Sequence, residues 1–346
     1  MTGGAGTSAP TTLDVAEAAG VSLATVDRVL NGRPGVREAT VARVREAIDR
    51  IGYVRDTAAA NLAKRRVYDL SFILPDTDNE FVASLRAEIE TRRAQPAIHR
   101  TRLTVTPVAA FDPQAVVAAL DAATGDGVAV FGPETPSVRD AVRRARVRGL
   151  AVVALVSDLP SSERDHFVGI DNIRAGRTAA QLMARFVAGP GRVLVITGSR
   201  LARDHLERRQ GFDQVMAETP GMSVGASLEG RDDPERVKSL LAEALTDDVV
   251  GIYSSAAGNA GLIAALEGRD LTVIAHELTP TTRAALMDGT FDALITQDAG
   301  HLVRSAIRLL RATADGAPFD PAQERIRIDI HLKENVPDPG PEGGQT

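Results

Sequence analysis

Apolar positions in the first 55 residues recur at helical spacing. They predict a helix that begins at Thr12, where the threonine hydroxyl can cap free backbone amides, and that ends at Gly20. Leu13, Ala16 and Ala19 are expected to share its apolar face. A second helix follows a Gly-Val-Ser turn, and a third covers about residues 37–51. Two short helices joined by a turn and braced by a third predict a helix-turn-helix module over residues 12–55.

From residue 67 onward, apolar segments typical of strands alternate with helical patterns. Strands are expected at 67–75, 102–110, 127–132, 150–157, 166–171, 192–198, 223–230, 249–255, 271–277, 292–297 and 325–332. Helices are expected at 79–93, 113–123, 138–148, from 173, at 206–218, 234–245, 259–266, 281–287 and from 299. Repeated strand-helix units predict parallel sheets with helices on both faces. Two such series predict an α/β body of two lobes, each with a parallel sheet, over 67–335, joined to the all-α head by 56–66 and flanked by disordered tails at 1–11 and 336–346.

The charge is distributed unevenly along the chain. Of the 346 residues, 44% are hydrophobic and 25% charged, which is ordinary for a globular protein. Residues 1–66 hold ten Lys/Arg and seven Asp/Glu, a net charge of +3, whereas the remainder holds 30 and 39, a net charge of −9. A basic head on an acidic body indicates that a polyanionic partner would bind the head.

Several classes of protein are disfavoured. No run of about 18 apolar residues predicts a membrane span, and MTGGAGTSAPTT lacks the basic and apolar regions of a signal peptide. The absence of cysteine excludes disulfides and thiolate metal sites and fits a cytoplasmic location. The sequence contains no GxSxG, P-loop, HExxH or Cys/His cluster. We therefore expect no enzyme, no cofactor and no metal site.

The head carries a run of residues that resembles a known family. TLDVAEAAGVSLATVDRVLNG, followed by GYVRDTAAANLA, is similar without a gap over residues 12–63 to the DNA-binding head of the LacI/GalR family of bacterial transcription repressors. In that family the second helix enters the major groove of double-stranded operator DNA. The resemblance implies that Leu23 and Ala24 face the bases and that Arg28 reaches a base edge or the backbone. It also implies that Ser22, Thr25 and Asn31 hold phosphates.

Two features of this head leave alternatives open. Thr25 and Asn31 also fit a helix cap and a solvated helix face. Asp27 stands where the family commonly has serine, and a carboxylate beside phosphates is unfavourable unless it pairs with Arg28 or Arg33 or accepts from a cytosine amine. The operator sequence is therefore not readable.

The junction DTAAANLAKRR, residues 56–66, is too short for a stable isolated helix. The resemblance implies a hinge that folds when two chains sit on DNA and that inserts Leu62 into the minor groove. The alternative is a plain linker with one stray leucine. Because the two hinges would fold only as they bind DNA, a body that separates them would prevent this folding and weaken the affinity for DNA.

The body resembles the type I periplasmic solute-binding fold, which serves the same family as its effector domain. Ligands in such sheets bind beyond the carboxyl ends of the strands. This implies an effector site built from Asp76, Asn79, Phe81, Asp158, Asp171, His205, Arg208, Asn259, His276, Glu277 and Gln297, with Ser157, Asn172 and Asp298 close by in the same loops. Some have structural alternatives: Asp171, Asn259 and Asp298 as helix caps, His276 and Glu277 as a surface pair, and Arg208 as an outward member of the run ERR.

The residue types in these loops indicate a small sugar or polyol. Carboxylates and amides exchange hydrogen bonds with adjacent hydroxyls, and arginine grips two oxygens. The AHE sequence replaces an Asp-rich loop common in the family. Aromatic residues make up 3% of the chain with no tryptophan, so ring stacking depends on Phe81 or another phenylalanine.

These observations lead to one main hypothesis. The chain is expected to be a cytoplasmic, nucleoid-associated homodimer, a transcriptional regulator of the repressor type, whose effector shifts the lobes and changes operator affinity. Segments 113–123 or 138–148 are candidates for part of the dimer surface. The alternative is a sugar-binding receptor without a gene-regulatory role, which predicts an export signal and no DNA-binding head.

Overall fold

The computed structural model describes residues 10–30, 32–53, 66–95 and 100–338. The chain divides into two compact units, Met1–Arg66 and Val67–Thr346, called here the head and the body. Within the described residues, no helix is both long and apolar enough to cross a membrane.

The head is a bundle of three helices. α1 (Thr12–Ala19), α2 (Leu23–Leu30) and α3 (Glu38–Ile51) pack around a small core. The buried core residues are Val15, Ala16, Ala19, Val26, Val44 and Ala47. Ala16 and Ala19 face inward as expected, but Leu13 is 64% exposed, because Val15 takes the inward position on the first turn.

The cap of α1 lies one residue earlier than the sequence predicted. Thr11, not Thr12, is the N-cap: its hydroxyl accepts from the Asp14 amide, and the Asp14 carboxylate accepts from the Thr11 amide at 2.6 Å. These hydrogen bonds, the one from the Thr11 backbone foremost, hold the pKa of Asp14 below its usual value. The reciprocal pairing with the third helical residue selects Thr11, since Asp14 is the acid at the required spacing.

The body contains two sheets. The first has the strand order β2-β1-β3-β4-β5 and the second β11-β10-β9-β8-β6-β7. The strands are β1 (Tyr68–Asp76), β2 (Thr101–Ala109), β3 (Gly127–Val130), β4 (Ala151–Leu155), β5 (His166–Val168), β6 (Gly191–Thr197), β7 (Met222–Glu229), β8 (Val249–Ser254), β9 (Thr272–His276), β10 (Ala293–Thr296) and β11 (Asp329–His331). All described pairs are parallel except β10 with β11, which is antiparallel. The two expected parallel sheets are thus present, with one antiparallel edge strand.

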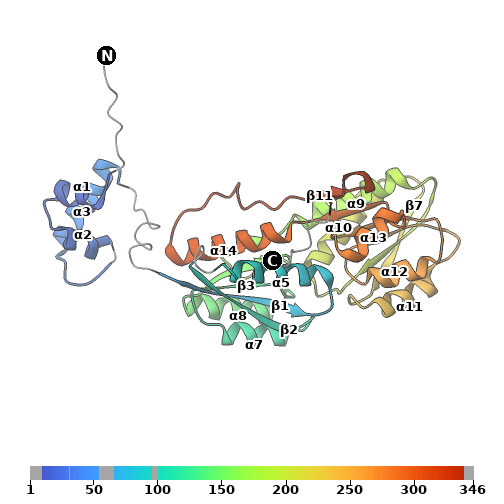
Figure 1. The fold of residues 1–346 in the computed structure, drawn as a ribbon, viewed down its shortest axis with the longest axis horizontal. Coiled ribbons are helices and arrows are strands. Elements are labelled where there is room, and N and C mark those ends of the chain that lie inside the picture. The colour runs from blue at the N-terminus through green and yellow to red at the C-terminus, as the bar shows by residue number, and fades with distance from the viewer. Residues whose placement is uncertain (1–9, 31, 54–65, 96–99, 339–346) are drawn as a thin grey trace, which may run out of the picture. The chain divides into compact units, whose positions relative to one another are not determined.

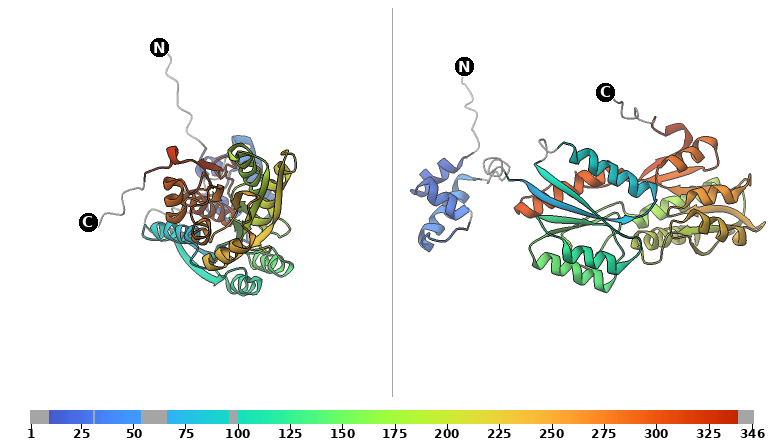
Figure 2. Two further views of the ribbon diagram at one scale, coloured as in Figure 1. Left: turned by 90° about the vertical axis from the view of Figure 1, so that its right-hand side faces the viewer. Right: turned by 60° about the horizontal axis from the view of Figure 1, so that its bottom comes forward.

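Helices cover both faces of each sheet, as the alternating pattern predicted (Figure 1; Figure 2). The body helices are α5 (Glu80–Arg93), α7 (Pro113–Ala122), α8 (Pro136–Val147), α9 (Asn172–Phe186), α10 (Arg203–Met216), α11 (Pro234–Ala244), α12 (Asn259–Leu266), α13 (Pro280–Asp288) and α14 (Ala299–Asp315). In the first lobe, α7 and α8 pack on one face and α5 and α14 on the other. In the second lobe, α11, α12 and α13 lie opposite α9 and α10.

The lobes are not two consecutive stretches of chain. The helix α9 leaves the first sheet and packs on β8, β9 and β10, whereas α14 leaves the second sheet and packs on β1, β3, β4 and β5. Figure 1 shows α14, near the red end of the colour range, beside α5 and β3 of the first lobe. The chain then returns to the second lobe as β11. The lobes are therefore joined by three crossings, between β5 and α9, β10 and α14, and α14 and β11.

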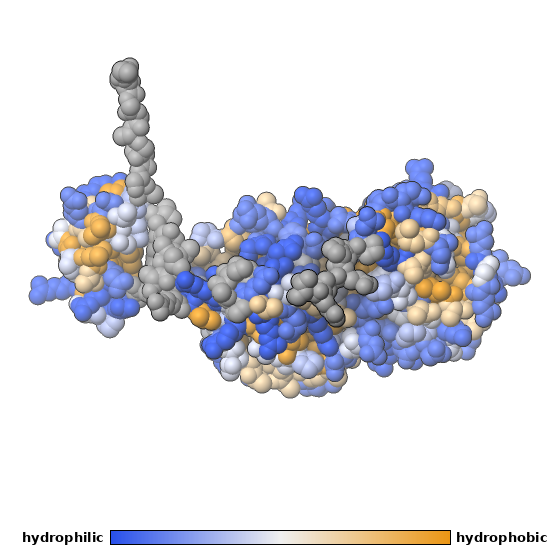
Figure 3. Space-filling view, in the orientation of Figure 1, coloured by the Kyte–Doolittle hydropathy of each residue, from blue (hydrophilic) through white to orange (hydrophobic). Residues whose placement is uncertain are grey.

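The last strand is shorter than expected. Residues 325–328 carry the alternating pattern but form no strand, and only Asp329–His331 pairs with β10. Ile326 instead packs into the core that both lobes share. The face of the body seen in Figure 3 is largely hydrophilic with scattered apolar areas.

Candidate ligand-binding cleft and recognition helix

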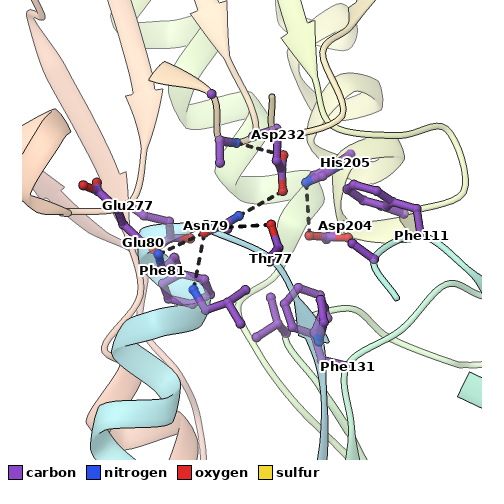
Figure 4. A pocket seen from close by; sticks show the side chains of 18 of the residues that line it. Thr77, Asn79, Glu80, Phe81, Phe111, Phe131, Asp204, His205, Asp232 and Glu277 are labelled. Carbon is purple, nitrogen blue, oxygen red and sulfur yellow. Dashed lines mark hydrogen bonds and ion pairs between the residues drawn. The ribbon is translucent and has the colours of Figure 1, made fainter. Parts of the chain in front are cut away.

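A cavity of about 250 Å³ lies between the two lobes of the body. Its walls are the segments that follow the carboxyl ends of β1, β2, β3 and β4 in the first lobe and of β7, β8 and β9 in the second, together with the start of α10. This is the place at which open parallel sheets bind ligands. Figure 4 shows the side chains of both lobes converging on it.

Four non-glycine residues around the cavity have a left-handed backbone. Val156 (φ 64°) follows β4 and Glu277 (φ 67°) follows β9, which are the equivalent strands of the two sheets. Each of them donates its amide to the next strand, to the Val168 carbonyl at 2.8 Å and to the Ile295 carbonyl at 2.9 Å. Non-glycine residues in this conformation are strained and cluster at functional sites.

The same correspondence between the two sheets identifies two cavity residues that the sequence analysis did not name. Phe111 (φ 57°) follows β2 and Asp232 (φ 60°) follows β7, again equivalent strands, and both line the cavity. Each precedes an aspartate that caps a helix and a proline in its first turn, so the signal was the repeated motif FDP and DDP. Asp232 accepts hydrogen bonds from the Ala257 amide at 3.2 Å and from the Asn79 side chain at 2.9 Å.

Arg208 is the central cation of the cleft. It is 3% exposed; Nε donates to Asn172 Oδ1 and Nη1 to the Ser255 carbonyl, both at 2.9 Å. Its Nη2 lies 3.5 Å from Glu277 Oε1. The outward-facing alternative for Arg208 is therefore excluded. Burial raises the pKa of Glu277, against the opposing effect of the Arg208 charge.

Asp204 and His205 begin the wall formed by α10. His205 Nε2 lies 3.6 Å from Asp204 Oδ2, while His205 Nδ1 accepts from the Ser199 amide at 3.3 Å. Burial acts to raise the pKa of the Asp204 carboxyl, but the charges of His205 and Arg208 hold it below its usual value. Asp204 Oδ1 is buried and has no hydrogen-bond partner among the described residues. Asp204 was not predicted, although it adjoins His205.

His276 is held as a neutral ring. Its Nε2 lies 2.8 Å from the hydroxyl of Tyr253, a ring that stacks on Phe212, and it is 2% exposed. Burial lowers its pKa well below the usual value, because a charged ring would be desolvated. The alternative of a surface pair with Glu277 is excluded, since both side chains are buried. Nδ1 has no partner in the described part of the chain.

Two asparagines and a phenylalanine complete the predicted set at the cleft. Asn79 caps α5 through Oδ1 and joins the lobes through its hydrogen bond to Asp232 (Figure 4). Phe81, in the first turn of α5, also lines the cavity. Asn259 is not a helix cap, because Gly258 holds that position; its Oδ1 accepts from Ser254 Oγ at 2.7 Å.

In the head, the predicted recognition residues lie on the start and outer face of α2. Ser22, Leu23, Ala24 and Arg28 are exposed and Thr25 is half-buried. The Thr25 amide donates to Ser22 Oγ at 3.2 Å, and the two hydroxyls are 2.9 Å apart. Asn31 and Leu62 lie outside the described residues, as does most of the expected hinge.

Asp27 has a partner three residues beyond the end of α2. Its Oδ2 lies 3.2 Å from Arg33 Nη1, with both side chains about half exposed. This is one of the two ion pairs that the sequence suggested, and it reduces the repulsion that a free carboxylate would exert on a phosphate backbone.

Comparison with known proteins assigns both units. The model for bacterial regulatory proteins of the lacI family matches residues 11–56, and that for the periplasmic binding protein domain matches residues 70–318. The chain belongs to the periplasmic binding protein domain family, and its head is similar to the lacI family of bacterial regulatory proteins. The similar proteins are transcriptional regulators, not enzymes.

Curated relatives of this chain include the HTH-type transcriptional regulator AglR of Rhizobium meliloti, 29% identical over 222 residues (62% of this chain and 59% of that protein). Catabolite control protein A of Streptococcus mutans is 31% identical over 191 residues, 52% and 55% of the two chains. The chain thus spans less than two thirds of the length of these relatives.

Solved structures agree with the fold of the body. A solute-binding protein of Burkholderia graminis in complex with D-arabinose has a TM-score of 0.71 at 24% identity, covering 78% of this chain and 97% of that one. GanP, a glucose-galactose binding protein of Geobacillus stearothermophilus, has a TM-score of 0.71 at 20% identity, covering 79% and 99%. At these identities the likeness shows the fold alone.

Four of the residues expected at the effector site do not line the cavity. Asp76 is exposed and pairs with Arg86 at 3.2 Å, because β1 ends with its side chain turned outward. Asp158 is held by Arg164. Asp171 caps α9 through the Arg174 amide at 3.0 Å, so its cap interpretation holds. Gln297 lies behind Glu277, to which its Nε2 donates at 2.9 Å, and positions that carboxylate.

Of the three residues expected close to the effector site, one lines the cavity and two do not. Ser157 lines the cavity and accepts from the Asp204 amide at 3.3 Å. Asn172 supports Arg208 from behind, and Asp298 caps α14.

Proposed function

We propose that this chain is a sequence-specific DNA-binding transcriptional regulator, of the repressor type, whose operator affinity changes when a small sugar or polyol binds between the lobes of the body. The observation that carries the proposal is that a lacI-type head precedes a cavity whose lining includes Asp204 and His276, each with a buried polar atom that has no partner among the described residues. Unpaired buried polar atoms are costly, and a ligand with several hydroxyls would satisfy them.

The proposed DNA contacts are carried over from the resemblance of the head to the lacI family: Leu23 and Ala24 would face the bases and Arg28 a base edge or the backbone, with Ser22, Thr25 and Asn31 at phosphates. The exposure of Ser22, Leu23, Ala24 and Arg28 supports this assignment. A homodimer with two heads fits a pseudo-palindromic operator, and such a regulator would work in the cytoplasm, at the nucleoid. A sugar receptor without a regulatory role does not account for the lacI-family match of residues 11–56.

Gel-shift titrations on DNA upstream of neighbouring genes, with and without candidate sugars, test the proposal. We expect a preference for one such fragment over random DNA at about 0.15 M salt, and a change of affinity with one of the sugars. Equal affinity for every fragment and for random DNA would refute the regulatory function.

A matched pair of variants tests the cleft. Arg208→Met should abolish the response to the sugar while leaving operator binding intact, because it removes the guanidinium that lines the cavity. Arg209→Met is the control, since Arg209 pairs with Asp213 and Ser227 and does not line the cavity. Equal responses of the two variants would remove Arg208 from the effector site.

A further inference from the structure

The charges lining the cleft do not balance. Among the described residues that line it, Arg208 is the single lysine or arginine. The carboxylates that line it are Asp78, Glu80, Asp204, Asp232 and Glu277. Even with Glu277 and His205 left out of the balance, four carboxylates face the one guanidinium group of Arg208. The wall is therefore acidic.

The cation that is present is already engaged. Two of the guanidinium nitrogens of Arg208 donate to Asn172 and Ser255, and the third is 3.5 Å from Glu277. His276 contributes no charge, because burial lowers its pKa well below the usual value. Arg208 therefore offers little to the carboxylates on the opposite wall.

One carboxylate oxygen of the wall is buried without a donor. Asp204 is 2% exposed, and its Oδ1 has no partner among the described residues, although His205 and Arg208 lie near this carboxylate. Within the described part of the chain, Asp232 and Glu80 accept hydrogen bonds from neutral groups alone: Asp232 from Asn79 and the Ala257 amide, and Glu80 from the amide and hydroxyl of Thr281. Carboxylates that have no cationic partner attract positive charge, so the cleft favours an occupant that brings it.

We propose that the cleft selects a polyhydroxylated ligand that carries a protonated amine, such as an amino sugar or an amino polyol, with the ammonium group bound by Asp204 and its neighbouring carboxylates. This inference rests on the proposed function of the cleft as the effector site. The hydroxyls of the ligand form hydrogen bonds with the asparagine and histidine side chains of the cleft, and the ammonium group supplies positive charge opposite the carboxylates.

Calorimetric titration of the full chain with matched compounds tests the inference. The pairs are glucose with glucosamine, galactose with galactosamine, and sorbitol with its N-methylamino analogue meglumine, with N-acetylglucosamine as the neutral amide. The titrations are made at pH 6.5, where amines with a pKa of about 7.7–8.0 are mostly charged. At least one amine should bind about tenfold more tightly than its neutral partner, since charge-assisted hydrogen bonds are about twice as strong as neutral ones.

Variants test whether the carboxylates of the cleft cause the preference for an amine. Asp204→Asn keeps the shape of the side chain and should reduce the ratio of amine to neutral affinity at least about threefold. Asp76→Asn is the matched control, because Asp76 is exposed and outside the cavity, and should leave the ratio unchanged. Asp232→Asn gives the same test should Asp204→Asn fail to fold.

The outcomes separate this inference from the proposed function. Neutral sugars that bind as tightly as their amines, or a ratio unaffected by both cavity variants, would overturn the amine preference and leave a sugar-responsive regulator. Absence of binding by every amine in the panel also overturns it. Operator binding in the gel shift does not depend on any of these results.

Discussion

Replacement of Gly176 by alanine should force α9 away from α10, the helix that carries the buried Arg208 of the cleft. A Cβ atom at Gly176 of α9 would lie 1.9 Å from the backbone carbonyl oxygen of Arg208 in α10. Real Cβ contacts essentially never fall below 3.0 Å, so the helices must separate by about 1.1 Å at this point. Because the obstructing atom belongs to the backbone, no side-chain rotation relieves the clash.

The magnitude follows from two opposing effects. Overpacking of a dense interior costs about 1–3 kcal/mol and sometimes more, and the rigid carbonyl places this site at the upper end. Alanine regains about 1 kcal/mol over glycine as a helix former. A net loss of about 2 kcal/mol at about 2–4 °C per kcal/mol lowers the Tm of the body by about 4–8 °C.

Thermal denaturation of the full chain, followed by circular dichroism, measures this loss. Gly189→Ala is the control, because nothing lies within 4 Å of its Cβ position and its backbone is not left-handed. The sugar that acts in the gel shift should also bind Gly176→Ala more weakly, since Arg208 moves with α10. A Tm for Gly176→Ala at or above that of Gly189→Ala would refute the close contact of the two helices.

Three further predictions concern the cap, a histidine and the hinge. Thr11→Ala should destabilise the head by about 0.5–2 kcal/mol and speed hydrogen exchange in α1, whereas Thr12→Ala should not. A larger loss of stability in Thr12→Ala than in Thr11→Ala would show that Thr12 is the cap. The folded pKa of His276 lies well below the unfolded value of about 6.5, so its contribution to stability is present above pH 6.5 and is lost as the pH falls toward the folded pKa. Between pH 7.5 and 5.5 the free energy of unfolding should therefore drop about 1.4 kcal/mol more in the wild type than in His276→Gln. His301→Gln is the control, and a wild-type slope equal to that of His276→Gln would contradict the assignment. Leu62→Ala should weaken binding to the operator more than binding to random DNA in filter-binding titrations, and equal losses on both would favour a plain linker.

The fold was readable from the sequence because each element carries a strong local signal. Strands such as β4 are buried throughout, and Asp-Pro or Thr-Pro pairs begin several helices, so the existence and type of each element were clear. The ends of the elements shifted by three residues or fewer, except at the start of β11, which shifted by four. The position of α14 was not readable. An apolar helix face does not identify its partner sheet, and the alternation suggested two separate series of elements.

The site was readable only in part, for a different reason. Position after a strand predicts that a residue lies at the correct edge of the sheet, but it does not predict the direction of the side chain. Asp76 and Asp158 satisfy the first condition and turn toward arginines outside the cavity, whereas Asp204 and Asp232 were missed. The direction of these side chains depends on ion pairs such as those of Asp76 and Asp158 and on backbone hydrogen bonds to the neighbouring strand, and neither kind of contact leaves a local pattern in the sequence.

The return of α14 to the first sheet has a consequence for how the chain matures on the ribosome. When residue 298 leaves the exit tunnel, β1 and β3–β5 already exist, but the apolar face that Leu302, Val303 and Leu310 will cover is still bare. The part of the body synthesised first is thus finished almost last. Nascent chains shorter than about 315 residues should hold an incomplete first lobe, exposed to chaperones and proteases, while the second lobe already has most of its own helices.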